Sequence, residues 1–307
     1  MDNFLIVAQQ VAVLFALMGF GALARKVRLI DDRGLEGVVN LLILIVTPCI
    51  IVDCFQRPYD PALSGGLGLA FAISVLGHLA VLALAYLFVR HRETNVRCPL
   101  LLAAVFSNAG FMGLPVEQAV LGDIGVFFGA VYIVVFNLFM WSWGYRTMKG
   151  GGGIGLKAFV NPGTVGLALG FPLFFFSVRL PEVVAAPIHH LSNLNTPLAM
   201  IVIGYCLVGA KFGKVLRLPG VYVAAGIRLV AYPLLVLAAL YPFRHQLDRN
   251  MMLAVVIAAS APVAAMVSMF ASKFNRDVDT AVALVSGTTL LSILTMPPVI
   301  ALAMSVL

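Results

Sequence analysis

The sequence predicts an all-α polytopic membrane protein with ten transmembrane helices in two inverted five-helix repeats, in which helices 4 and 9 are broken. Three observations predict it: composition, alternation of positive loops, and landmarks that recur half a chain apart. Of the 307 residues, 62% are hydrophobic and 11% charged, against about 25% charged in an average soluble domain. So much apolar surface favours lipid as the solvent, where helices satisfy their own backbone groups. The alternating strands of an outer-membrane barrel are absent.

Runs of about 20 apolar residues, bounded by charges or by Gly and Pro clusters, define the spans. They cover residues 4–24, 35–55, 62–89, 97–121, 123–145, 158–178, 188–210, 220–242, 250–272 and 278–305. The first run ends in Arg25-Lys26 rather than in a small-residue cleavage site, and no basic segment precedes it. We therefore expect a retained span rather than a signal peptide.

Positive charge alternates strongly between the loops on the two sides. Of the 20 Lys and Arg residues, 15 fall in one set of alternate loops and four in the other, and Arg228 lies inside a span. Because cytoplasmic loops retain positive charge, this bias places both termini outside the cytoplasm and supports an even number of spans. The net charge of +7 is thus explained by the orientation of the chain in the membrane, and no nucleic-acid partner is expected.

A glycine cluster at Gly150–Gly153 separates two halves of the chain. It lacks the G-K-[ST] ending of a phosphate-binding loop, so we interpret it as a flexible joint. The predicted organisation is an N-terminal repeat over 1–145, a cytoplasmic linker over 146–157 and a C-terminal repeat over 158–307. Three landmarks recur after 147 to 150 residues: Thr47-Pro48 and Thr196-Pro197, His78 and Arg228, and Pro115 and Pro262.

The fourth span contains the most informative stretch, Ser107 to Pro115, with the sequence SNAGFMGLP. Gly110, Gly113 and Pro115 lower helix propensity and remove a backbone donor, so the helix is expected to open there. Irregular backbone at membrane depth is tolerated only inside protein or beside a watery cavity. The interruption therefore predicts a binding site that includes Asn108 and Phe111.

The ninth span carries a milder interruption from Ser260 to Ala265, centred on Pro262. If the two breaks meet, helix N-termini converge near the midplane, and their free N–H groups suit an anion such as a carboxylate. Ordinary proline kinks are the alternative.

Two basic residues, His78 and Arg228, lie deepest in their halves. A basic group at that depth needs a cavity or a partner, and it could attract an anion or relay protons. Arg228 could instead extend its side chain to the cytoplasmic interface, and His78 could be a neutral histidine bonded to a neighbouring helix.

Further polar residues could support the site. Thr47, Asn193 and Asn195 supply hydroxyl and amide groups in spans 2 and 7, where interhelical hydrogen bonding is the simpler interpretation. Glu117 and Asp53 are expected at the membrane interface, although the position of Glu117 beside the break makes it a candidate for cation or proton coupling.

The four cysteines, Cys49, Cys54, Cys98 and Cys206, form no C-x-x-C pair. Neither a zinc site nor a disulfide framework is indicated, and no metal or cofactor is expected.

These motifs resemble the auxin efflux carrier family over the whole chain. The resemblance rests on the segment from Ser107 to Pro115, the Thr-Pro of span 2, Asn161-Pro162 and the sequence APVAAM at 261–266. Bacterial members are described as malonate or malate transporters. The resemblance implies that the broken helices 4 and 9 cross and form the substrate site. It also implies a scaffold of helices 1, 2, 6 and 7 and a mobile domain of helices 3–5 and 8–10. Two departures from the plant carriers are the short linker and His78, which replaces an acidic and basic pair.

The predicted function is secondary active transport, of the elevator type, of a small organic anion such as a mono- or dicarboxylate or an auxin-like acid, across the plasma membrane (in bacteria the inner membrane). The alternatives are a sodium-coupled carrier like the bile-acid symporters and an anion channel. Hydrolytic motifs such as H-E-x-x-H are absent, which argues against an enzyme. Proton or sodium coupling and the formation of a homodimer are left open.

Overall fold

The computed structural model describes residues 2–57, 61–151, 160–209, 213 and 215–307. Their regular secondary structure is helical, with a single isolated β-bridge between Ser107 and Val263. The first half contains α1 (Asp2–Lys26), α2 (Asp32–Leu41), the π turn η1 (Leu42–Val46), α3 (Thr47–Cys54), α4 (Pro61–Phe88), α5 (Thr94–Val105), η2 (Ala109–Gly113), α6 (Leu114–Leu121), α7 (Asp123–Phe139), η3 (Met140–Gly144) and α8 (Tyr145–Lys149).

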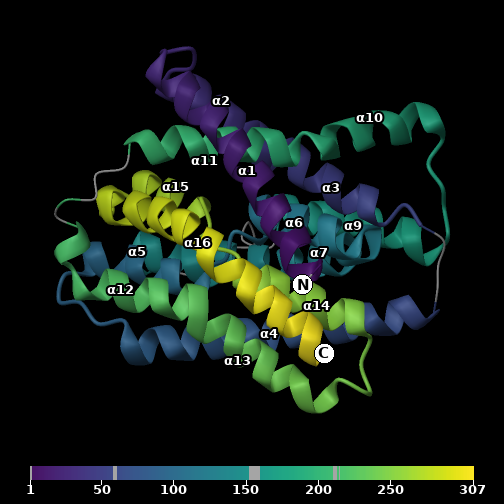
Figure 1. The fold of residues 1–307 in the computed structure, drawn as a ribbon. Helices are drawn as coiled ribbons and strands as arrows, with labels where there is room; N and C mark the ends of the chain where they lie inside the picture. The colour runs from purple at the N-terminus through teal and green to yellow at the C-terminus, as the bar shows by residue number, and fades with distance from the viewer. Residues whose placement is uncertain (1, 58–60, 152–159, 210–212, 214) are drawn as a thin grey trace.

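The second half contains α9 (Pro162–Phe175), α10 (Glu182–Asn193), α11 (Asn195–Gly209), η5 (Val215–Arg217), α12 (Pro219–Gly226), η6 (Ile227–Ala231), α13 (Tyr232–Leu240), η7 (Tyr241–Phe243), α14 (Arg249–Ser260), α15 (Met266–Lys273) and α16 (Val278–Val306). Figure 1 shows α6 and α7 in the middle of the helix assembly.

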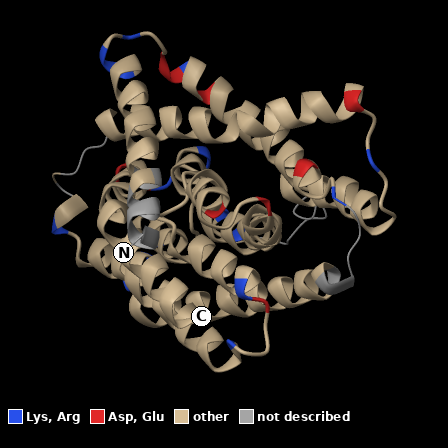
Figure 2. Cartoon of the chain, turned by 45° about the vertical axis from the view of Figure 1, so that its right-hand side comes forward, with Lys and Arg blue, Asp and Glu red and all other residues tan. Residues whose placement is uncertain are grey.

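Six helical stretches of the described chain are long and apolar enough to cross a membrane: Asp32–Cys54, Gly65–Phe88, Asp123–Lys149, Glu182–Gly209, Pro219–Phe243 and Val278–Val306. Figure 2 shows long stretches without charge between charged helix ends and loops. The protein is therefore a multi-pass membrane protein. Of the predicted central linker, residues 152–157 lie outside the described part of the chain.

Short polar side chains in the loops start several helices. The side chains of Asp31, Asn161, Asp248 and Asp277 each accept a hydrogen bond from the backbone N–H three residues further on, at 2.7 to 3.0 Å. Such caps satisfy one of the first-turn donors that a helix leaves without an internal partner. The chain thus enters these helices at defined residues.

Prolines inside the long helices follow π turns. Thr47-Pro48, Leu114-Pro115 and Tyr232-Pro233 come directly after η1, η2 and η6. A π turn widens the backbone and already leaves one carbonyl without its usual donor, so a residue that lacks an N–H fits there. The helix continues past each proline instead of ending at it.

Helices α1 and α11 cross in close contact near Gly21 and Gly204 (Figure 1). A Cβ placed on Gly21 would overlap the backbone of Ile201, and one on Gly204 would overlap the backbone of Met18. Small residues allow backbones to approach in membranes, where association depends on tight packing. These two glycines fix the distance between α1 and α11.

Candidate functional site

Two helix interruptions meet in the centre of the molecule. Helix α5 ends at Val105 and the helix resumes at Ala109, while α14 ends at Ser260 and α15 begins at Met266. The N–H of Asn108 donates to the carbonyl of Pro262 at 2.7 Å, and the N–H of Ala264 donates to the carbonyl of Phe106 at 3.0 Å. The two irregular segments therefore meet and pair through an isolated antiparallel bridge between Ser107 and Val263.

The position of the first break differs from the expectation. Gly110, Gly113 and Pro115 lie in the first turns of the resumed helix, and only Phe106 to Asn108 are outside it. The π turn η2 accommodates Pro115, so the helix is not interrupted at the proline. The gap instead coincides with the residues that hydrogen-bond the second break.

Arg228 joins the C-terminal ends of both interrupted helices. Its Nη1 donates to the carbonyl of Val105 at 2.8 Å, its Nη2 donates to the carbonyl of Ala259, and its guanidinium lies 4.6 Å from the ring centre of Tyr232. The residue is fully buried, so its side chain does not extend to the interface. A cation at the end of a helix compensates the partial negative charge of the last carbonyls, and here one cation does so for two helices.

A short chain of hydroxyl groups runs beside the crossing. Ser107 Oγ donates to the Tyr132 hydroxyl at 3.3 Å, and the hydroxyls of Tyr132 and Tyr232 lie 3.4 Å apart. Tyr132 comes from α7 and Tyr232 from α13. Buried hydroxyls need such partners, and these bonds tie the first break to the helices around it.

His78 lies in an aromatic environment and not in a cavity. Its Nδ1 is 2.8 Å from the carbonyl of Ser74, and its ring lies 5.0 Å from that of Tyr132 and 5.1 Å from that of Phe139. The residue is fully buried, and Nε2 has no hydrogen-bond partner. Nδ1 therefore carries the proton that bonds the backbone, as in a histidine that stabilises its own helix.

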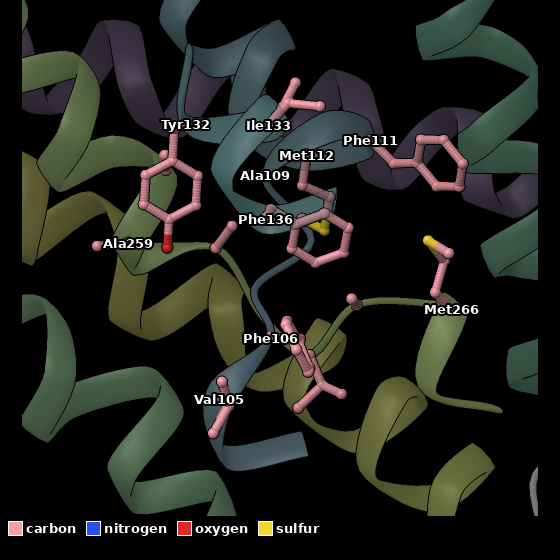
Figure 3. Packing of buried hydrophobic residues seen from close by; sticks show 14 of the residues in the cluster. Val105, Phe106, Ala109, Phe111, Met112, Tyr132, Ile133, Phe136, Ala259 and Met266 are labelled. Carbon is pink, nitrogen blue, oxygen red and sulfur yellow. The ribbon is translucent and has the colours of Figure 1, made fainter. Parts of the chain in front are cut away.

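A cavity of about 50 Å³ opens next to the crossing. Its walls come from η1 and α3, from the two breaks with η2 and the starts of α6 and α15, from α7, and from single residues of α9 and α11. The lining residues are Ile43, Thr47, Ile50, Ile51, Ser107, Asn108, Gly110, Phe111, Leu114, Ile133, Phe136, Asn137, Pro162, Asn195, Ala264, Ala265 and Met266. Figure 3 shows Phe111 and Met266 extending to the same side of the crossing.

Two amide groups in this cavity keep free hydrogen-bonding capacity. The side chain of Asn108 is buried, and its Nδ2 has no partner. Asn195 Nδ2 donates to the carbonyl of Gly110 at 2.8 Å, which leaves Asn195 Oδ1 without a partner. Buried polar groups rarely stay unpaired in folded proteins, and these two atoms are exceptions beside the cavity.

The structure divides the predicted site residues. Those that line the cavity are Asn108, Gly110, Phe111, Thr47 and Asn195. Others shape the crossing behind it, namely Gly113, Pro115, Ser260, Pro262 and Arg228. His78 and Glu117 are buried elsewhere, and Asn193 is exposed at the end of α10.

The structure contradicts the expected interfacial position of Glu117, whereas that of Asp53 stays a prediction. Glu117 is only 1% exposed, because α6 turns this side chain toward α7 instead of toward the membrane interface. Asp53 is partly exposed and pairs with His189, with Nδ1 and Oδ2 3.0 Å apart.

Sequence reasoning missed Asn137, Ser107 as a lining residue, and the tyrosine pair. Asn137 lines the cavity while its Nδ2 donates to the carbonyl of Ile133 at 2.9 Å. An amide in the middle of the apolar fifth span was a signal that could have found it. Tyr132 and Tyr232 carried no such signal, because tyrosines are common in apolar spans.

The long apolar helices define a polytopic membrane protein with a cavity at a double interruption, and the comparisons place it among membrane transporters. A family described as "Membrane transport protein" matches residues 6–154 and 152–300. The chain belongs to this family, that of the auxin efflux carriers. It is also 25% identical over 299 residues to an uncharacterized transporter of Methanothermobacter thermautotrophicus. The alignment covers 94% of this chain and 96% of the relative.

Proposed function

We propose that the protein is a secondary active transporter of a small organic anion, a mono- or dicarboxylate or an auxin-like acid, which binds in the cavity beside the crossing. The observation that carries this proposal is that Asn108, which lines the cavity, has an Nδ2 without a hydrogen-bond partner. The first turns of two helices also line the cavity, at Gly110 and at Met266. First-turn N–H groups and an amide donor together favour a negatively charged oxygen.

The composition of the cavity supports an anion as substrate. No acidic residue is among the described lining residues, and the polar side chains are a threonine, a serine and three asparagines. The other walls are apolar and aromatic, which suits a small acid with a hydrocarbon body. Arg228 does not line the cavity. It binds the last carbonyls of α5 and α14 and compensates their partial negative charge, which would otherwise repel the anion.

The location of the cavity supports movement of one helix group against another. One wall consists of Thr47 and its neighbours with Pro162 and Asn195, from helices of the scaffold that the family resemblance implies. The opposite wall is the crossing itself. A body of α4–α8 and α12–α16 that carries the crossing past α1–α3 and α9–α11 would expose the cavity alternately to the two sides.

Ten spans in two inverted repeats fit the order of the helices. The six long stretches are supplemented by α1, by the interrupted pairs α5–α6 and α14–α15, and by α9. The two family matches meet at residues 152–154, near the predicted boundary between the halves. Figures 1 and 2 show the two termini near each other, which agrees with an even number of spans. The charge bias of the loops supports an orientation in which both termini lie outside the cytoplasm, in a plasma membrane.

The alternatives receive less support. An anion channel needs a continuous polar path, whereas this cavity is small and mostly apolar. Sodium coupling needs several oxygen ligands at one point, and none of the described residues that line the cavity is acidic.

Uptake into proteoliposomes tests the proposal. Purified protein would be reconstituted and tested with labelled malonate, malate, acetate and indole-3-acetate, with and without pH and Na⁺ gradients. We expect saturable uptake of at least one acid and accelerated exchange when the same unlabelled acid is inside. Flux that does not saturate would indicate a channel, and no uptake of any acid would contradict the choice of substrate class.

A further inference from the structure

Glu117 is a buried carboxyl group that the cavity does not use. It lies on α6 and is 1% exposed, and its Oε2 has no hydrogen-bond partner. The carboxyl group occupies space that Gly129 of α7 leaves open, because a Cβ on Gly129 would overlap it. On the other side Gly113 places α6 against Ala258 of α14. The side chain thus fits a niche formed by three helices.

Helices α1, α7 and α14 and the turn η2 pack against α6. Among the side chains that the structure describes in these elements, no charged group faces Glu117. Asp123 at the start of α7 accepts a hydrogen bond from Gln118, and Arg249 at the start of α14 bonds the carbonyl of Met304. On α1, Arg25 bonds the carbonyl of Tyr205, and Lys26 is exposed in its last turn. The element η2 carries no titratable residue. Glu117 therefore has no counter-ion among them.

A carboxylate in such surroundings would be costly. Removing an ion from water without a partner costs several kcal/mol, and isolated ionisable groups within membranes mark ion or proton pathways. A sodium ion would need several oxygen ligands, whereas the neighbours here are glycines and apolar side chains. The neutral carboxylic acid is the form that fits this niche.

The niche and the cavity share their helices. Asn108 precedes the continuous helical stretch 109–121 that carries Glu117, about 13 Å of helix away at 1.5 Å per residue. On α7, Ile133 lines the cavity one turn beyond Gly129. An anion that moves the start of this stretch therefore also moves the carboxyl group.

We propose that Glu117 is the proton-binding site of the carrier, and that one proton bound there moves with each anion. The proposal rests on the function proposed above. The proton comes from water on one side of the membrane and returns to water on the other, and no bond other than the carboxyl O–H forms or breaks. Only the protonated carboxyl group enters the niche, so the crossing moves only when Glu117 has bound a proton. Transport is therefore driven by the proton gradient.

The transport test uses proteoliposomes and the acid that the wild-type protein takes up. A pH gradient of about one unit supports up to about tenfold accumulation when one proton accompanies a monoanion. In Glu117→Gln the amide imitates the neutral acid and cannot release a proton. We expect this variant to lose the accumulation driven by pH but to keep exchange of internal for external substrate. Asp123→Asn, an exposed acid on the next helix, is the control and is expected to behave as wild type.

Exchange activity also shows that Glu117→Gln is folded. Accumulation by Glu117→Gln equal to that of the wild type would overturn the proposal. If the variant loses exchange as well, the second measurement decides.

That measurement uses the wild-type protein and needs no substrate. Dicyclohexylcarbodiimide reacts with protonated carboxyl groups in apolar surroundings, and peptide mass spectrometry locates the adduct. We expect labelling of Glu117 that falls as the pH rises, and none of Asp123. Absence of a Glu117 adduct at acidic pH would overturn the proposal. Failure of every acid to be taken up, with Glu117 still labelled, would instead contradict the proposed substrate class.

Discussion

The backbone N–H of Asn108 lies 2.7 Å from the carbonyl oxygen of Pro262, although 154 residues separate them in the chain. This hydrogen bond joins two helices at the points where each is interrupted. Pro262 cannot donate from its own nitrogen, and Thr288 accepts the next N–H, that of Val263, at 3.1 Å. The backbone groups freed by the two breaks are thus largely satisfied by each other and by α16, as protein within a membrane requires.

Cross-linking tests the pairing of the two breaks. Ser107 and Val263 form the antiparallel bridge, and the Cα atoms of such a pair lie about 4.5–5.5 Å apart, within the range of a disulfide. In a chain with the native cysteines replaced, Ser107→Cys with Val263→Cys should cross-link on mild oxidation, as detected by peptide mass spectrometry. The pair Ser107→Cys and Ser305→Cys is the control. Because the crossing is proposed to move as one body, the cross-linked carrier should still transport.

Substitution of Asn108 tests the anion site. Asn108→Ala removes one donor to a charged substrate, which is worth about 1.5–3 kcal/mol, so kcat/KM for uptake should fall by roughly tenfold to a hundredfold. Asn193→Ala changes an exposed amide on α10 and should transport normally. Both variants should reach the membrane in equal amounts, measured by quantitative blotting. Unchanged uptake by Asn108→Ala would move the site away from the crossing.

Arg228 is expected to act on stability more than on substrate affinity. Arg228→Gln shortens the side chain and leaves the carbonyls of Val105 and Ala259 without their donor, at a cost of about 2–5 kcal/mol for two unpaired groups. The melting temperature of the purified protein should therefore fall clearly. The exposed Arg244, which bonds the carbonyl of Tyr241, is the control, and Arg244→Gln should melt within a degree or so of the wild type. A large rise in KM with an unchanged melting temperature would instead place Arg228 on the substrate.

Substitution of two glycines on α1 distinguishes the effect of close helix packing from the effect of helix propensity. Gly21→Ala introduces a Cβ into the backbone of Ile201, which cannot move aside as a side chain could. We expect destabilisation of about 1–3 kcal/mol, as for other overpacked sites, seen as a lower melting temperature. Gly19→Ala meets nothing within 4 Å and should be neutral or slightly stabilising. Equal behaviour of the two variants would contradict the close contact of α1 with α11.

The sequence by itself determined the membrane environment, the helical class and the two interruptions. These follow from local properties: the length of apolar runs, the charges in the loops, and residues such as Pro262 that cannot complete a helix. Asn108 was predicted as a site residue for the same reason, since it closely precedes Gly110 and Gly113 within an apolar span. Such signals depend only on neighbours in the chain.

The tertiary structure alone decided which polar groups meet. Whether Arg228 reaches lipid, substrate or backbone depends on where α5 and α14 end in space, and no pattern around residue 228 encodes that position. The burial of Glu117 likewise depends on Gly129 of another helix, and the exact gap depends on a π turn that absorbs Pro115. Side chains with several possible partners are placed by packing between distant segments, which the local sequence does not contain.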